Sequence, residues 1–201
     1  MSRGSLDRHT ARPARRAALL LAVLLTAACG GGGGGGDEAL PCTPLTFDRA
    51  LSSLSNGDVY LDQASGTCSS VGIAVLINNL QNIWSVGFDL SYPSSSLSYD
   101  TCTLGPLLQK GSPSTPIQVL VMEGSGELHV LVTRFAPDPS VNAAGSEALV
   151  TCRFQRVAAG SGIIDFDVSP SSLGSEVVLD ELGGTRPATF APGHGGLVTV
   201  P

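Results

Sequence analysis

Strict alternation of apolar and small or polar residues in the middle of this sequence restricts that part of the chain to β structure. From Trp84 to Tyr92, every even-numbered residue is large and apolar, and every odd-numbered residue is serine, glycine or aspartate. Because successive side chains of a strand point to opposite faces, this segment turns one face to a core and the other to solvent. Trp84, Val86, Phe88 and Leu90 are therefore predicted to be buried.

Similar segments recur at short intervals from Asp58 onward, separated by Gly, Pro, Ser and Asn, and helical periodicity is absent. The predicted strands are Asp58–Asp62, Ser70–Asn78, Ile83–Tyr92, Leu97–Leu104, Ile117–Met122, Glu127–Phe135, Glu147–Val157, Gly162–Val168 and Gly196–Val200. A further short strand is expected at Glu176–Leu179. This spacing indicates an all-β domain folded as a two-sheet β-sandwich.

The first 28 residues have the layout of a signal peptide. Five arginines precede an uninterrupted apolar run from Ala17 to Leu25, and small residues follow it. As a helix this run covers about 14 Å, roughly half of a ~30 Å hydrocarbon core, so a permanent transmembrane span is not expected. We therefore assign residues 1–28 to an export signal.

The segment Leu25–Cys29 resembles the lipobox of bacterial lipoproteins, in which the cysteine is diacylated and becomes the new N-terminus. The resemblance implies that Cys29 carries lipid; the alternative is an ordinary cleavage site beside an incidental cysteine. Seven glycines, Gly30–Gly36, follow. A glycine run of this length has a root-mean-square reach of about 15 Å, which makes residues 29–40 a flexible tether.

The chain beyond the signal is acidic. The whole sequence has a formal net charge of -6, and residues 1–28 hold five Arg and one Asp, so the remainder carries six basic and sixteen acidic residues, a net charge of -10. Lys110 is its only lysine. Without a basic surface the domain cannot neutralise a phosphate backbone, so nucleic acid is not expected as a partner.

Four cysteines remain once Cys29 is assigned to lipid: Cys42, Cys68, Cys102 and Cys152. In an exported protein an even number favours two disulfides, and three pairings are possible. No CxxC motif or neighbouring histidine pair accompanies these cysteines, so a zinc site is not expected.

The order and spacing of the apolar segments from Asp58 to Val200 resemble those of a cohesin domain. The segments that carry the resemblance are Ile73–Asn79, Ile83–Pro93, Leu104–Leu108, Ala148–Phe154 and Gly196–Val200. Cohesins are nine-stranded jelly-roll sandwiches that bind dockerin modules, and related folds bind carbohydrate. The resemblance implies a cohesin-like jelly roll at residues 58–201, preceded by an N-terminal arm at residues 41–57.

The same resemblance implies a disulfide pattern. In the cohesin arrangement, the strand that matches the one holding Cys102 lies beside the strand that matches the one holding Cys152. A Cys102–Cys152 bond is therefore implied, which leaves Cys42 to pair with Cys68.

The cohesin topology also implies a binding face on one sheet, flat, acidic and made of small residues, with Leu120 and Met122 at its edge. Its members are Ser85, Gly87, Asp89, Ser91, Asp165 and Asp167. A face of this kind suits docking of a protein or a sugar, and an inert solvated sheet face is the alternative.

No catalytic residue, cofactor or metal site is predicted. No serine lies in a Gly-x-Ser-x-Gly turn, and no histidine pair has metal-binding spacing. Asp165 and Asp167 point to the same side of one strand about 7 Å apart, a separation that glycosidases use, but nothing nearby in sequence would raise the pKa of either carboxyl. Asp138–Asn142 spaces three oxygen side chains as calcium loops do, but Ala143 stands where such a loop needs glycine.

These inferences predict a non-catalytic binding module of cohesin-like type, held at the cell envelope by lipid on Cys29, with the outer membrane or cell surface favoured. Its expected partner is a dockerin-like protein module or a polysaccharide. Sugar-binding platforms use exposed tryptophan or tyrosine, and with Trp84 predicted in the core only Tyr60 and Tyr99 are left, which favours a protein. The alternative function is a structural envelope lipoprotein without a soluble ligand.

Overall fold

The computed structural model describes residues 42–168, 177–180 and 182–201. The expected export signal and tether, residues 1–40, lie outside the described residues, as does the first residue of the strand expected at Glu176–Leu179. The described residues belong to one compact unit. The described residues form eleven strands, and among them no helix is long and apolar enough to cross a membrane.

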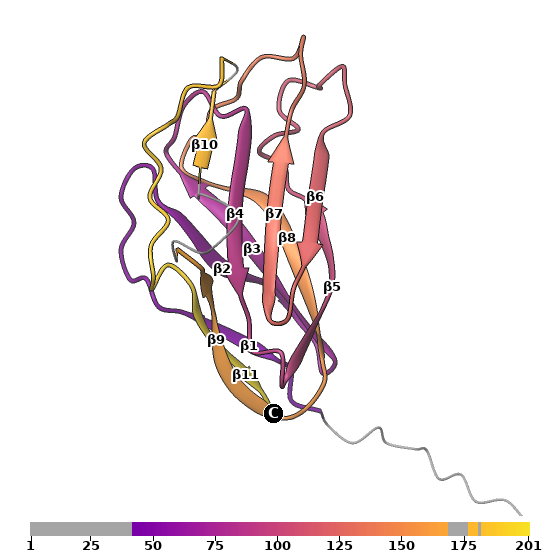
Figure 1. Cartoon of the computed structure of the whole chain (residues 1–201). Coiled ribbons are helices and arrows are strands. Elements are labelled where there is room, and N and C mark those ends of the chain that lie inside the picture. The colour runs from indigo at the N-terminus through magenta and orange to yellow at the C-terminus, as the bar shows by residue number, and fades with distance from the viewer. Residues whose placement is uncertain (1–41, 169–176, 181) are drawn as a thin grey trace, which may run out of the picture. The chain divides into compact units, whose positions relative to one another are not determined.

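The strands form two antiparallel sheets (Figure 1). The larger sheet has the order β1-β11-β9-β4-β7-β6, and β10 pairs with β4 beside β9. Its strands are β1 (Thr46–Arg49), β4 (Ser85–Ser91), β6 (Gln118–Glu123), β7 (Glu127–Thr133), β9 (Gly160–Phe166), β10 (Val177–Leu179) and β11 (Gly196–Val200). The smaller sheet has the order β2-β3-β8-β5. Its strands are β2 (Val59–Gly66), β3 (Ser70–Asn78), β5 (Leu97–Leu104) and β8 (Ser146–Arg156). The predicted all-β two-sheet sandwich is confirmed.

One apolar core lies between the sheets. Alternate residues of facing strands fill it: Val71, Ile73, Val75 and Ile77 from β3, Val150, Cys152 and Phe154 from β8, and Val86, Phe88 and Leu90 from β4. Phe88 meets Phe166 of β9 edge to face, with ring centroids 5.9 Å apart, a geometry that aromatic pairs prefer. In β4 the two-residue period of the sequence selects Val86, Phe88 and Leu90 for the core, as predicted.

Trp84 departs from this prediction because it is only half-buried. It lies just before β4, where its backbone N–H donates to the carbonyl of Leu179 and its indole Nε1–H donates to the carbonyl of Asp138 at 3.3 Å. A tryptophan N–H needs an acceptor when it leaves water, and the loops at this end of the sheet supply one. The prediction of a fully buried Trp84 is wrong.

All nine predicted strands occur; β3, β5 and β11 have the predicted bounds, and the ends of the other six differ by at most four residues. Val168, expected to continue the alternation of β9, lies beyond the end of that strand and is exposed. Two short strands add to the nine. β10 falls within the strand expected at Glu176–Leu179, whereas β1 lies in the segment 41–57 that was expected to be an arm.

β1 joins that arm to the larger sheet. It pairs with β11 in antiparallel register, with Phe47 opposite Val198. Both Phe47 and the preceding Leu45 are buried in the core. Residues just after Cys42 therefore belong to the sandwich.

The disulfide pairing is confirmed. Cys102 and Cys152 lie directly opposite each other in the β5–β8 register and are bonded. Cys42 is bonded to Cys68 in the turn between β2 and β3. The second bond fastens the chain that leads into β1 to the smaller sheet.

Candidate binding face

The outer face of the larger sheet is formed by the strand positions whose side chains point away from the core. Because side chains alternate along a strand, these positions lie between the buried ones. They include Gln118, Leu120 and Met122 on β6; His129, Leu131 and Thr133 on β7; Ser85, Gly87, Asp89 and Ser91 on β4; Ser161, Ile163 and Asp165 on β9; and Leu197 and Thr199 on β11. Figure 1 shows β4, β7 and β6 side by side in this sheet.

Exposed aliphatic side chains gather where β6, β7 and β4 adjoin. Leu120, Met122 and Leu131 are 51%, 60% and 39% exposed. Leu131 lies opposite Leu120 on one side and Gly87 on the other. A Cβ atom on Gly87 would lie 3.8 Å from Leu131 Cδ1 and 3.8 Å from Val177 Cγ1, so aliphatic groups flank a position that has no side chain. We call Leu120, Met122, Leu131 and Gly87 the β6–β7 patch.

A second apolar pair lies on the other side of β4. Ile163 of β9 and Leu197 of β11 are directly opposite each other and are 63% and 45% exposed. We call them the β9–β11 patch. Single exposed aliphatic residues are common on protein surfaces, whereas grouped ones on one face are typical of interaction sites.

Asp89, expected to be an exposed member of the binding face, is only 2% exposed. It lies opposite His129 in the β4–β7 register, and its Oδ1 is 2.8 Å from His129 Nδ1. A carboxylate leaves water at low cost only when such a partner accompanies it. The expectation of an exposed carboxylate at this position is therefore wrong.

Asp165 is half-buried and its carboxylate is held by backbone N–H groups. It accepts hydrogen bonds from Gly193 at 2.6 Å, from Gly195 at 2.9 Å and from Phe166 at 2.9 Å. This carboxylate fixes the loop that leads into β11, so it is less open to a partner than the sequence indicated. Asp167 is also half-buried, and its backbone N–H donates to the carbonyl of Asp89 at 3.0 Å.

The two serines of β4 likewise turn their hydroxyls to the protein. Ser85 is buried and its Oγ–H donates to the carbonyl of Val132 at 3.3 Å. Ser91 is half-buried and its Oγ–H donates to the carbonyl of Asp165 at 3.4 Å. The outer face is thus made of small residues over β4, as expected, but its exposed character is apolar rather than acidic.

None of the outer positions named above is a lysine or arginine. Four cations of the described chain form ion pairs elsewhere, Arg49–Asp62, Lys110–Glu147, Arg153–Asp100 and Arg186–Asp180, and Arg156 is exposed at the end of β8 in the smaller sheet. Arg134 is buried and donates through a guanidinium nitrogen to the carbonyls of Leu108 and Lys110. Exposed carboxylates, among them Asp48 and Glu127, lie at the ends of strands of this sheet. The outer face therefore combines apolar patches with negative charge.

Sequence reasoning did not single out three of the five exposed aliphatic residues. Leu131, Ile163 and Leu197 each stand beside an apolar residue that faces the core. Two adjacent apolar residues break the alternation of a half-exposed strand. That break is the signal by which an exposed apolar position could have been recognised.

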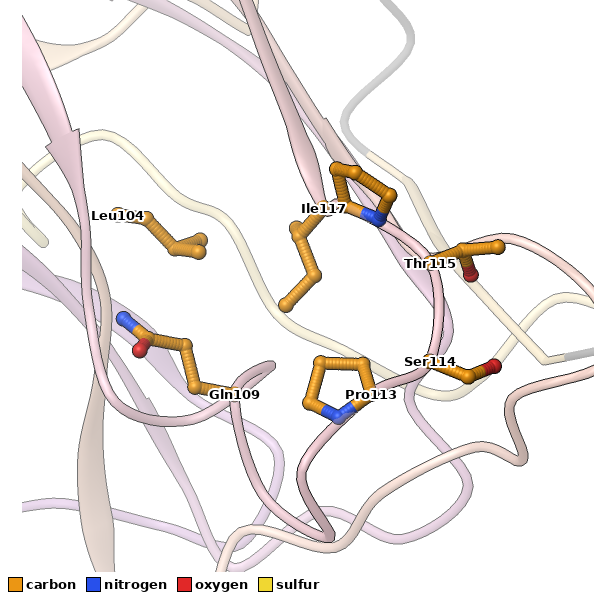
Figure 2. Close-up of a pocket in the computed structure, with 7 residues that line it drawn as sticks. Leu104, Gln109, Pro113, Ser114, Thr115 and Ile117 are labelled. Atoms are coloured by element: carbon orange, nitrogen blue, oxygen red, sulfur yellow. The ribbon is translucent and has the colours of Figure 1, made fainter.

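A groove of about 380 Å³ lies beside residues 113–117, which lead into β6, and is outside the outer face. Figure 2 shows Leu104, Pro113 and Ile117 around a common space, with Gln109 at its margin. The amide of Gln109 donates to the carbonyl of Gly105 at 3.1 Å. This lining is mostly apolar and provides no set of groups for acid–base or nucleophilic chemistry.

Asp138 shapes the loop beside this groove. Its carboxylate accepts hydrogen bonds from the backbone N–H and the hydroxyl of both Ser114 and Thr115. These hydrogen bonds, with that from the Thr115 hydroxyl the strongest influence, hold the pKa of Asp138 well below its usual range. The carboxylate that resembled a calcium ligand in the sequence thus organises a loop. Among the described residues, no cluster of three or more His, Cys, Asp or Glu could hold a metal ion.

No family model and no curated protein matches the sequence. Solved structures do match. The sixth cohesin of scaffoldin B from Acetivibrio cellulolyticus, solved in complex with a mutant dockerin, has a TM-score of 0.54 at 15% identity, covering 71% of this chain and 97% of that one. A type II cohesin from Bacteroides cellulosolvens has a TM-score of 0.52 at 12% identity, covering 64% of this chain and 90% of that one. The second type II cohesin module of the adaptor scaffoldin of A. cellulolyticus has a TM-score of 0.50 at 15% identity, covering 71% of this chain and 93% of that one. This similarity establishes a cohesin-like fold.

Proposed function

We propose that this cohesin-like domain is a non-catalytic module that docks a protein partner on its outer face. The observation that carries the proposal is the grouping of five exposed aliphatic side chains there: Leu120, Met122, Leu131, Ile163 and Leu197. Burial of apolar surface stabilises a complex by about 25 cal/mol per Å² removed from water. Covering the two patches with a partner therefore favours binding. Because Asp89 is buried beside His129, β4 presents no exposed charge that binding of a partner would have to desolvate.

The charge of the outer face indicates what its partner carries. Because the face has carboxylates at its margin and no cation at its named outer positions, a partner with an apolar centre and a basic rim complements it. Attraction of this kind is screened by salt, so association slows as ionic strength rises. The similar cohesin of A. cellulolyticus was solved with a dockerin bound, which supports a protein module of that kind as the partner.

A polysaccharide is a weaker candidate for the ligand. Carbohydrate platforms stack sugar rings on exposed aromatic side chains. Tyr60 and Tyr92 are buried, Tyr99 is half-buried and packs against Phe154, and Trp84 is half-buried with its N–H bonded. None of these four aromatic residues is at an outer position, and the exposed Phe135 lies beyond the end of β7, so the outer positions of the strands favour a protein.

Docking is tested by capture from envelope and secreted extracts with residues 37–201, exported so that both disulfides form. All core residues of the described chain lie between Leu45 and Val200, so this fragment contains the complete core. Leu131→Lys places a charge at the centre of the β6–β7 patch, and Thr103→Lys, on the exposed face of the smaller sheet, is the matched control. The proposal expects a partner that wild type and Thr103→Lys retain and Leu131→Lys loses. A partner held equally by all three would place docking elsewhere.

We further propose that the chain is exported and held at the cell envelope by lipid on Cys29, with the outer membrane or cell surface as its site. The apolar run Ala17–Leu25, the small residues before Cys29 and the glycine tether support this. Two acyl chains give stable membrane anchoring. Metabolic labelling with an alkyne fatty acid should mark the full chain and the Gly36→Ser control but not Cys29→Ser. Label retained by Cys29→Ser would contradict lipidation at this residue.

A further inference from the structure

The edge strands of the two sheets differ in how well they are protected against pairing with another chain. The sheet orders place β1 and β6 at the edges of the larger sheet and β2 and β5 at those of the smaller. An exposed edge presents a row of backbone N–H and C=O groups, so natural proteins block edges with bulges, charges, proline or short strands.

Three of these edges carry such protection. β2 has a register shift between Gln63 and Ser65, and β5 has one between Tyr99 and Thr101. Charged side chains stand on both strands, and each forms an ion pair. β1 is only four residues long and ends in two charged residues. Another strand cannot easily extend any of these edges.

β6 carries none of these protections. Its six residues, Gln118–Glu123, pair with β7 without a register shift, and its four central residues are Val, Leu, Val and Met. Its single charge is Glu123 at the end of the strand, and that carboxylate accepts a hydrogen bond from the Tyr92 hydroxyl at 3.0 Å. Among the described residues, no backbone hydrogen bond links β6 to a strand or loop other than β7.

The hairpin after β6 shows which of its backbone groups point outward. The N–H of Gly124 donates to the carbonyl of Glu127 at 2.8 Å, closing the turn between β6 and β7. Hydrogen-bonded and non-hydrogen-bonded pairs alternate along an antiparallel ladder. The N–H and C=O groups of Val119, Val121 and Glu123 therefore point away from β7, toward the side on which no strand pairs with β6.

We propose that this edge pairs with the same edge of a second copy of the chain, so that the larger sheet continues from one copy into the other. In an antiparallel arrangement about a two-fold axis at Val121, Val119 lies opposite the partner subunit's Glu123. Leu120 lies opposite the partner subunit's Met122, and both point to the outer face. No like charges meet, and the outward N–H and C=O groups of each copy face those of the other. The strand is thus complementary to itself, as a two-fold interface requires.

The pairing has consequences for size and shape. A two-fold axis perpendicular to the sheet keeps both outer faces on one side and brings the two β6–β7 patches together at the axis. A six-residue edge buries less than the roughly 800 Å² per partner of a standard interface, so we expect a weak, micromolar dimer. Leu131 lies on β7 rather than at the edge, so its substitution in the docking test leaves this pairing intact.

Sedimentation velocity of residues 37–201 from micromolar to millimolar concentration tests the proposal. In the dimer, Met122→Lys places a lysine of each copy opposite Leu120 of the other copy. Lysine at a sheet edge opposes pairing with another strand. Ile163→Lys, a charge of the same sign at an equally exposed position on β9, is the matched control. Wild type and Ile163→Lys should dimerise with equal affinity, and Met122→Lys at least about tenfold more weakly. Thermal unfolding followed by circular dichroism checks that both variants are folded.

Amide hydrogen exchange gives a second readout that does not depend on a variant. The amides of Val119 and Val121 should exchange more slowly at high protein concentration, and those of β1 should not change. A wild type that stays monomeric throughout, or a Met122→Lys variant that dimerises as well as wild type, would overturn the proposal. Slowing at these two amides only when a different protein is added would assign the edge to that protein instead.

Discussion

His129 and Asp89 meet across β7 and β4, with Nδ1 of the imidazole 2.8 Å from Oδ1 of the carboxylate. The pair stands between the β6–β7 patch and the β9–β11 patch. Because Asp89 is buried beside His129, the middle of the outer face presents a partly exposed imidazole where the sequence indicated a free carboxylate. This contact removes the Asp89 carboxylate from the exposed surface and leaves the exposed carboxylates at the margin of the face.

Loss of the Asp89 carboxylate should destabilise the domain. Asp89→Ala leaves His129 Nδ1 without its acceptor in a poorly solvated position, and we expect the free energy of unfolding to fall by about 1–3 kcal/mol. Urea denaturation at neutral pH measures the difference. Asp48→Ala, at an exposed position of β1, should change stability by less than about 0.5 kcal/mol. Equal effects of the two substitutions would mean that the buried pair does not contribute as described.

The Cys102–Cys152 bond should contribute strongly to stability. It closes a sequence separation of 50 residues between neighbouring strands. Replacement of both cysteines by alanine should lower the free energy of unfolding by about 2–4 kcal/mol, mostly by freeing the unfolded chain. The double alanine variant of Cys42 and Cys68, whose separation is 26, provides the comparison. Guanidinium unfolding that shows no change for the Cys102 and Cys152 variant would contradict this expectation.

Asp138 should make stability depend on pH in the acid range. Hydrogen bonds from Thr115 and Ser114 lower the pKa of its carboxyl in the folded state. A carboxyl with a lowered folded pKa adds stability above its unfolded pKa of about 3.9 and loses it as pH falls toward the folded value. Asp138→Ala should therefore lower the melting temperature at pH 7, and the difference from wild type should shrink below about pH 4.

The same melting experiment with Asp48→Ala controls for loss of a surface charge. Its curve should follow that of wild type at both pH values. If the Asp138→Ala deficit were as large at pH 3 as at pH 7, the hydrogen bonds to the ionised carboxylate would not be its cause.

The sequence predicts the core well because the core depends on local alternation. Val86, Phe88 and Leu90 are buried as their spacing in β4 requires, and the resemblance to cohesins placed Cys102 beside Cys152 correctly. A two-residue period states which side of a sheet each residue occupies. It does not state what covers that residue.

The binding face was predicted less well for that reason. Asp89 is covered by a residue 40 positions away in the sequence, and Asp165 is held by N–H groups 28 and 30 positions away. Neither contact leaves a local pattern. Trp84 likewise has a distant partner, because its indole N–H donates to the carbonyl of Asp138, 54 positions away.

β1 was missed because a four-residue strand is too short to show a period. Its place in the sheet comes from pairing with β11, at the opposite end of the domain sequence, and from burial of Leu45 and Phe47. Long-range pairing of this kind is set by the assembled sheet rather than by the residues of the strand itself.

Site-specific photo-crosslinking in the producing cells tests the docking role of the outer face most directly. A benzophenone amino acid at position 131 reports contacts of the β6–β7 patch, and the same probe at position 103 reports contacts of the smaller sheet. Both positions are exposed strand residues, so the fold should tolerate the probe. If the outer face docks a protein, position 131 gives a discrete adduct with a second protein species and position 103 gives none. Adducts from position 103 alone, or none from position 131 in cells that do produce the folded chain, would contradict it.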